Sequence, residues 1–152
     1  MDEKTLRILE KEIDLIQSCI NRMAQNSFIV RGWAITLITF ALALISKSID
    51  IKLLCGILFV VAVCFWYLDA FFLKMERMYR WKYEWVIANR QRNETSLFDL
   101  NPYNKDMWGQ DKQGNERKEP RMILVMFSKT LIPIYVTLIV LEAVLFIYAL
   151  LQ

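Results

Sequence analysis

The sequence contains no histidine and only three cysteines, so the side chains that most often bind zinc are scarce. Cys19, Cys55 and Cys64 show no CxxC spacing, which predicts neither a metal site nor a disulfide framework. No nucleotide-binding loop, pair of catalytic carboxylates or nucleophile with a neighbouring base is recognisable. We therefore expect no enzymatic activity, no catalytic residue, no cofactor and no bound metal.

Glycine and proline are also scarce, with four and three residues, so long helices are expected. Hydrophobic residues make up 56% of the chain and gather in blocks, and no charge lies between Lys52 and Asp69. A bilayer core about 30 Å thick needs roughly 20 apolar residues in a helix. The sequence therefore predicts an all-α integral membrane protein with three transmembrane helices, at residues 27–47, 51–73 and 122–152.

The distribution of lysine and arginine predicts the orientation of these three spans. Eleven basic residues lie between Lys74 and Arg121, two lie in the hairpin at 47–52, and none follows Lys129. Basic residues favour the cytoplasmic side. We expect a bacterial inner-membrane protein with its N-terminus and residues 74–121 in the cytoplasm and its C-terminus in the periplasm. The first 25 residues lack the pattern of a signal peptide, so the first span is expected to direct its own insertion.

Residues 1–26 are predicted to form a cytoplasmic amphipathic helix that continues into the first span. Apolar residues recur at intervals of three and four, as in a coiled coil, and small residues continue the stripe every seven positions. Two interpretations remain open: the stripe packs against the chain's own cytoplasmic helix, or it joins subunits. The residues of this seam are Leu9, Ile13, Ile16, Ile20, Ser27, Ala34 and Ala41.

Residues 74–92 are predicted to extend the second span as a helix into the cytoplasm, with aromatic and basic residues interleaved. One interpretation is an interfacial belt, in which the aromatic rings and basic side chains meet lipid headgroups. The other is a surface for an anionic ligand, with arginines for phosphates and aromatics for bases. Its members are Arg77, Arg80, Arg90, Arg92, Trp81 and Trp85.

Residues 93–121 are predicted to form a polar cytoplasmic loop, because asparagine, aspartate, glycine and proline are frequent and apolar residues come singly. The length of this loop and its single aromatic residues suggest docking points for a partner. These are Phe98, Tyr103 and Trp108.

Three charged residues lie inside the predicted spans. Arg31 and Asp69 have matching depths near the cytoplasmic ends of their helices, which is compatible with a predicted ion pair or with each side chain reaching the interface on its own. If Lys129 marks the cytoplasmic boundary, Glu142 lies near mid-membrane, where no basic residue of the other spans has a matching depth, whereas a helix that begins near Met122 moves Glu142 toward the far interface. Such a carboxylate usually faces a bundle interior or water. Pro133 is expected to kink or loosen the third helix.

A family resemblance is carried by two segments, RMAQNSFIVRGWAITLITFALAL and FWYLDAFFLKMERMYRWKYEWV. Over about residues 20 to 90 the chain resembles small bacterial membrane proteins encoded in anti-phage defence loci, similar to SLATT-type effectors that accompany nucleotidyltransferase-like sensors. The resemblance implies a homo-oligomer, with a tetramer as one candidate size, that a nucleotide or oligonucleotide signal or a soluble sensor protein triggers. The third predicted span departs from the usual two-span description of these proteins.

The leading hypothesis from the sequence is a ligand-gated pore that depolarises the inner membrane, with Glu142 in the conducting path. The alternative is a non-conducting membrane anchor that recruits a soluble partner through residues 93–120. The intramembrane carboxylate and the seam of small residues favour the pore, whereas the polar loop favours the anchor.

Overall fold

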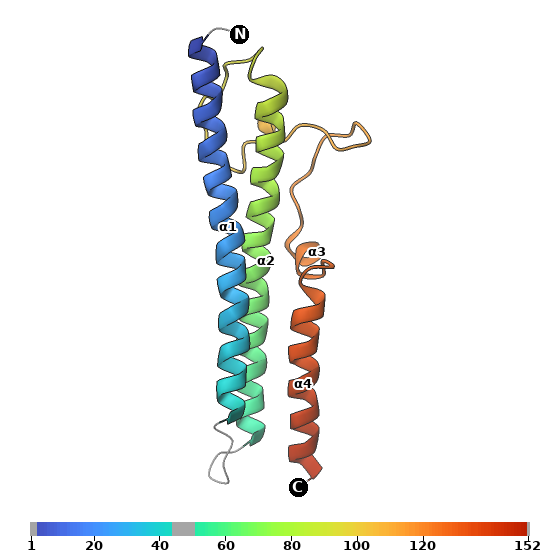
Figure 1. Ribbon diagram of the computed structural model, residues 1–152. Coiled ribbons are helices and arrows are strands. Elements are labelled where there is room, and N and C mark those ends of the chain that lie inside the picture. The colour runs from blue at the N-terminus through green and yellow to red at the C-terminus, as the bar shows by residue number, and fades with distance from the viewer. Residues whose placement is uncertain (1–2, 44–50, 152) are drawn as a thin grey trace. The chain divides into compact units, whose positions relative to one another are not determined.

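The computed structural model of the protein describes residues 3–43 and 51–151. These residues form α1 (Glu3–Ala43), α2 (Ile51–Asn89), the 3-10 helix η1 (Lys105–Met107), α3 (Met122–Met126) and α4 (Ile132–Leu151) (Figure 1). The described residues contain no strand, and one isolated bridge joins Gln110 to Glu116. The predicted all-α fold is confirmed.

The chain divides into two compact units, and α1 and α2 each contribute to both. The polar unit contains Met1–Gln25 and Phe72–Pro120, and the apolar unit contains Asn26–Phe71 and Arg121–Gln152. The unit boundaries fall close to the predicted ends of the first two spans, where the composition changes from polar to apolar.

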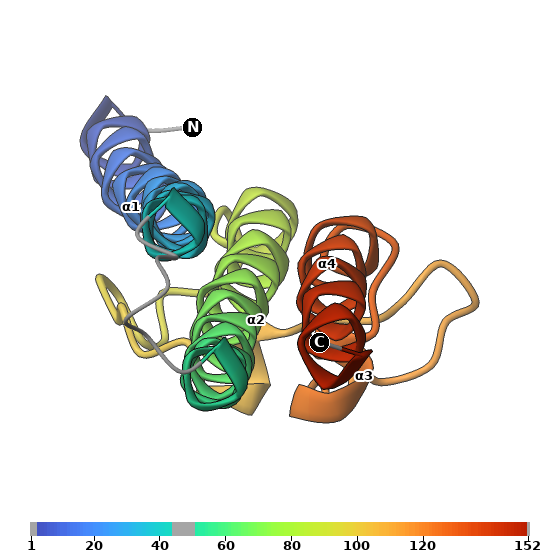
Figure 2. The ribbon, with the colours of Figure 1, turned by 90° about the horizontal axis from the view of Figure 1, so that it is seen from below.

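In the apolar unit, the first part of α2 lies between α1 and α4 (Figure 2). The core consists of Ile38 from α1 with Leu58 and Ala62 from α2, and Leu138 of α4 packs against it. Ala34 is fully buried, and Ala41 also packs against this core. Small residues on α1 therefore bring it close to α2 of the same chain.

In the polar unit, the apolar stripe of α1 packs against the second part of α2. Ile16 forms a buried cluster with Val86 of α2 and Met107 of η1, and three further stripe residues pack against this cluster: Leu9, Ile13 and Ile20. Ile16 is fully buried within the chain, whereas Leu9, Ile13 and Ile20 are half-buried. The structure therefore favours the intrachain interpretation for Ile16, and contact of the seam with another subunit stays a prediction.

Among the described residues, α2 alone is long and apolar enough to cross a membrane by length and composition. Only 22% of its most apolar 18-residue window is buried inside the protein. A core helix of a soluble protein would be mostly buried, whereas Leu53, Val60 and Tyr67 of α2 are all more than half exposed. The apolar stretch of α4, Ile132–Tyr148, is shorter.

The predicted third helix at 122–152 is interrupted. α3 ends at Met126 and α4 begins at Ile132. In the turn between them, the backbone N–H groups of Leu131 and Ile132 both donate to the carbonyl of Ser128. Pro133 is the second residue of α4. A proline in the first turn of a helix breaks no intrahelical hydrogen bond, so it favours the start of α4 and does not kink it.

Candidate functional site

Asp69 of α2 is the centre of a buried polar cluster in the apolar unit. The Arg31 Nε donates to Asp69 Oδ2 at 2.7 Å, and the Tyr135 hydroxyl donates to the same oxygen at 3.2 Å. The Ser27 hydroxyl donates to Oδ1. Asp69 is fully buried, whereas the Arg31 side chain is 22% exposed. The predicted ion pair between Arg31 and Asp69 is confirmed, and it joins α1, α2 and α4.

Glu142 of α4 is buried in the same unit but has no such partners. It is 3% exposed, and among the described residues neither carboxyl oxygen has a hydrogen-bond partner. A cavity of about 260 Å³ lies beside it between α2 and α4. The other lining residues are Cys55, Gly56, Phe59, Ile139, Ala143 and Phe146.

In the polar unit, a second buried ion pair joins α1 to α2. The Arg90 guanidinium binds both oxygens of Glu12 at 2.6 Å, and the exposed fractions of the two side chains are 2% and 0%. Arg90 also donates to backbone carbonyls of the following loop, and its guanidinium lies 5.4 Å from the centre of the Trp85 ring. The carbonyls are those of Asn93, Thr95 and Ser96.

These contacts correct the predicted anionic-ligand surface. Arg90 is an internal ion-pair partner and is not open to a ligand. Trp81 packs edge-to-face on Trp108 at 5.9 Å and lies below the Arg117 guanidinium. Arg80 is exposed but pairs with Glu76 one helical turn away. Of the remaining members, Arg77 is half-buried, Trp85 lies against Arg90 and Arg92 is exposed.

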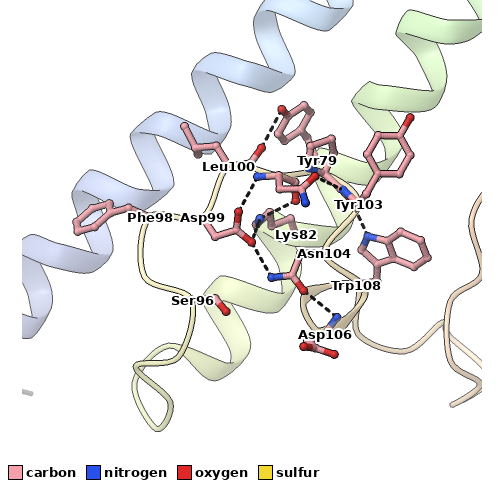
Figure 3. Close-up of polar contacts among 12 residues, drawn as sticks. Tyr79, Lys82, Ser96, Phe98, Asp99, Leu100, Tyr103, Asn104, Asp106 and Trp108 are labelled. Atoms are coloured by element: carbon pink, nitrogen blue, oxygen red, sulfur yellow. Dashed lines mark hydrogen bonds and ion pairs between the residues drawn. The ribbon is translucent and has the colours of Figure 1, made fainter.

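Lys82 of α2 holds the following loop in place (Figure 3). Its ammonium is 1% exposed, lies 3.1 Å from Asp99 Oδ2 and donates to the Asn101 carbonyl at 2.9 Å. Asn104 donates to the same Asp99 oxygen at 2.6 Å, and the Tyr79 hydroxyl donates to the Leu100 carbonyl. The loop is therefore fixed to α2 by buried polar groups.

The loop is further shaped by its own asparagine and aspartate side chains. Each of five such side chains accepts a hydrogen bond from the backbone N–H two residues later, which replaces the backbone partners that a helix or sheet would supply. The five residues are Asn93, Asp99, Asn101, Asn104 and Asp111. Outside η1 the loop is irregular, and these hydrogen bonds shape it between residues 93 and 113.

Acid should loosen this loop. Burial acts to raise the pKa of Asp99, but hydrogen bonds from Asn104 and Asn101 and the Lys82 ammonium outweigh burial and lower the pKa below its ordinary value. A carboxyl with a lowered folded pKa stabilises the fold above its unfolded pKa, about 3.9, and this stabilisation is lost as the pH falls through the folded value. We expect the protection of residues 99–104 from hydrogen exchange, relative to the intrinsic rate at each pH, to fall below about pH 4.

The matched control for this prediction is Asp99→Asn, in which the amide cannot titrate. Its protection from exchange at residues 99–104 should be lower than that of the unaltered chain at neutral pH and should change little on acidification. An equal acid response in both proteins would assign the effect to another carboxyl, of which Asp111 is the nearest in sequence with a lowered pKa.

Several of these residues were not recognised in the sequence. Glu12 lies three residues after Leu9 and four before Ile16, on the apolar side of α1. A charge at such a position indicates a buried ion pair. The regular occurrence of asparagine and aspartate after residue 93 indicated capped turns. Lys82 and Tyr135 had no such signal, because a basic or aromatic residue in a long helix is equally compatible with the surface.

The described residues contain no group of three or more cysteine, aspartate or glutamate side chains that could hold a metal ion. No protein-family model, curated protein or solved structure matches the chain. The resemblance of residues 20 to 90 to anti-phage effectors therefore stays a prediction.

Proposed function

We propose that the apolar unit spans the bacterial inner membrane with three helices and that the polar unit lies in the cytoplasm. Exposed apolar side chains on all three helices of this unit support three spans. On α1, Phe28, Trp33 and Phe40 are each more than half exposed, and α4 exposes residues such as Val140, Val144 and Ile147 to a similar degree. Contiguous apolar surface of this kind is rare on soluble monomers and favours contact with lipid.

Cysteine labelling tests this topology. In a chain with the three native cysteines replaced, Lys112→Cys should react with a membrane-impermeant maleimide only after the inner membrane is opened. Ser48→Cys should react in intact spheroplasts. Equal labelling of Lys112→Cys in intact and opened spheroplasts would refute a cytoplasmic polar unit.

We further propose that the protein is a homo-oligomeric effector that conducts cations and depolarises the membrane. The observation that carries this proposal is the carboxyl of Glu142, halfway along α4, which is buried and has no hydrogen-bond partner in the part of the chain that the structure describes. Intramembrane carboxyls are expensive and commonly mark ion pathways. Rings of acidic side chains favour cations in channels. The cavity beside Glu142 leaves open space next to this group.

Liposome flux tests conduction. Cation flux through the purified protein should fall at least about tenfold in Glu142→Gln, because the amide has the same size and no charge. The matched control is Asp14→Asn, which removes an exposed carboxylate from the polar unit and should leave flux unchanged. Equal flux and selectivity in the wild type and in Glu142→Gln would remove Glu142 from the conducting path.

A second candidate function is a membrane anchor for a soluble partner such as a sensor protein. The loop supports it, because Leu97, Phe98 and Tyr103 are exposed apolar side chains on an ordered backbone. Ser96 and Phe98 also adopt positive φ angles of 55°, which are unfavourable for side chains of this size. An anchor predicts that Phe98→Ser abolishes partner binding while purified wild type shows no flux. If the chain itself binds a nucleotide signal, Arg90 is not part of that binding site, because its guanidinium is buried against Glu12.

A further inference from the structure

The cavity beside Glu142 combines one buried acid with apolar walls. Its walls are formed mainly by the side chains of Phe59, Ile139 and Phe146 and by the exposed backbone at Gly56. Because these walls offer few hydrogen-bond partners, water bound there would lack the two to four polar contacts that normally hold it. The carboxyl therefore has neither a hydrogen-bond partner within residues 3–43 and 51–151 nor a favourable site for ordered water.

The cavity is also reachable from the outer surface of the apolar unit. Phe59 is 49% exposed and Phe146 is 40% exposed, and both lie on faces that would meet lipid acyl chains. At Gly56 an added Cβ would meet no atom within 4 Å. A small molecule dissolved in the bilayer could therefore enter between α2 and α4 without passing through the polar unit.

We propose that this cavity is a binding site for a small apolar molecule that carries one basic amine. The amine enters from the lipid in its neutral form, and its apolar body fills the space between Phe59 and Phe146. The proton of the Glu142 carboxyl then moves to the amine nitrogen, so that an ammonium and a carboxylate form with no change in net charge. This ion pair supplies the hydrogen-bond partner that Glu142 lacks, in an environment where such pairs are strong.

The inference rests on one part of the proposed function, namely that a bilayer surrounds α2 and α4. It does not require that the protein conducts ions. Binding is measured without flux, so the two proposals can fail separately. A protein that binds the amine but passes no cations refutes the pore alone. A protein that passes cations but binds no amine refutes the inference alone.

The experiment uses the full chain in phosphatidylcholine nanodiscs and tritiated cyclohexylmethylamine as the probe. We expect saturable binding to the wild type that is at least tenfold weaker in Glu142→Gln and in Gly56→Leu. Gly56→Leu keeps the carboxyl but fills the cavity. The matched control is Gly32→Leu, at another exposed helical glycine where a Cβ meets open space, and it should bind like the wild type. Cyclohexylmethanol, which has no basic nitrogen, should not compete.

A second measurement needs no variant. Dicyclohexylcarbodiimide adds to a protonated carboxyl: the proton goes to one carbodiimide nitrogen, the oxygen bonds to the central carbon, and the adduct rearranges to a stable acylurea. Cyclohexylmethylamine should slow the appearance of this adduct on Glu142, detected by mass spectrometry of the peptide. No saturable binding to the wild type, equal binding to Glu142→Gln, or an unchanged modification rate with the amine present would overturn the proposal.

Discussion

Arg90→Met should release the loop at residues 93–98 and destabilise the polar unit by about 3 to 5 kcal/mol, as expected when one partner of a buried ion pair is removed. Methionine keeps an unbranched apolar stem but leaves the Glu12 carboxylate buried without its bidentate partner. It also removes the donor to the carbonyls of Asn93 and Thr95, which lie 2.9 and 2.7 Å from Arg90 Nη1. The remaining donor to Glu12, the backbone N–H of Phe98 at 3.3 Å, cannot neutralise a charge.

Hydrogen exchange and limited proteolysis of the loop measure this effect. The matched control is Arg92→Met, which removes an exposed arginine two residues later and should leave both unchanged. The double variant Glu12→Leu/Arg90→Met should recover part of the loss, because no unpaired charge remains buried. If Arg90→Met and Arg92→Met have the same effect, the internal role of Arg90 is wrong and the ligand-binding interpretation returns.

Asp69→Asn should have a comparable effect in the apolar unit, with a loss of about 3 kcal/mol or more of stability. The change keeps the shape of the side chain but removes the only charge that balances Arg31 in this cluster. It also replaces an oxygen that accepts from Tyr135 or Ser27 with an amide nitrogen that can only donate. Because Asp69 joins α1, α2 and α4, the packing of all three helices should loosen together.

Thermal unfolding in detergent, followed by circular dichroism, measures this loss. Tyr135→Phe removes one hydrogen bond to Asp69 without exposing a charge, so it should cost only about 1 kcal/mol. Arg31→Gln/Asp69→Asn should be more stable than Asp69→Asn alone, because two neutral amides can bond to each other. An Asp69→Asn protein as stable as Tyr135→Phe would mean that Arg31 reaches the lipid headgroups and does not need its partner.

The burial of α1 shows that sequence periodicity alone does not predict which side chains of a long helix are buried. Leu37 lies between Ala34 and Ala41 at the spacing of three and four that defines the seam, yet it is 39% exposed, and Ile38 is buried in its place against Leu58 and Ala62. An ideal α-helix has 3.6 residues per turn, so a stripe defined by a 3.5-residue period drifts around a long helix. The same period fits both an intrachain partner and a second subunit, and the packing of α2 against α1 shows that part of the stripe has an intrachain partner.

What the sequence by itself determined is the part that depends on local composition: long helices, the apolar blocks, the polar loop, and the places of Arg31, Asp69 and Glu142 inside apolar blocks. Matching helix depths were enough to predict the pairing of Arg31 with Asp69. The tertiary structure alone decided which side chains are buried together. The sequence pattern predicted an exposed cation at Arg90. In the structure Arg90 is buried, because Glu12, 78 positions earlier, lies opposite it. A contact between residues so far apart follows from how helices pack, which no local pattern encodes.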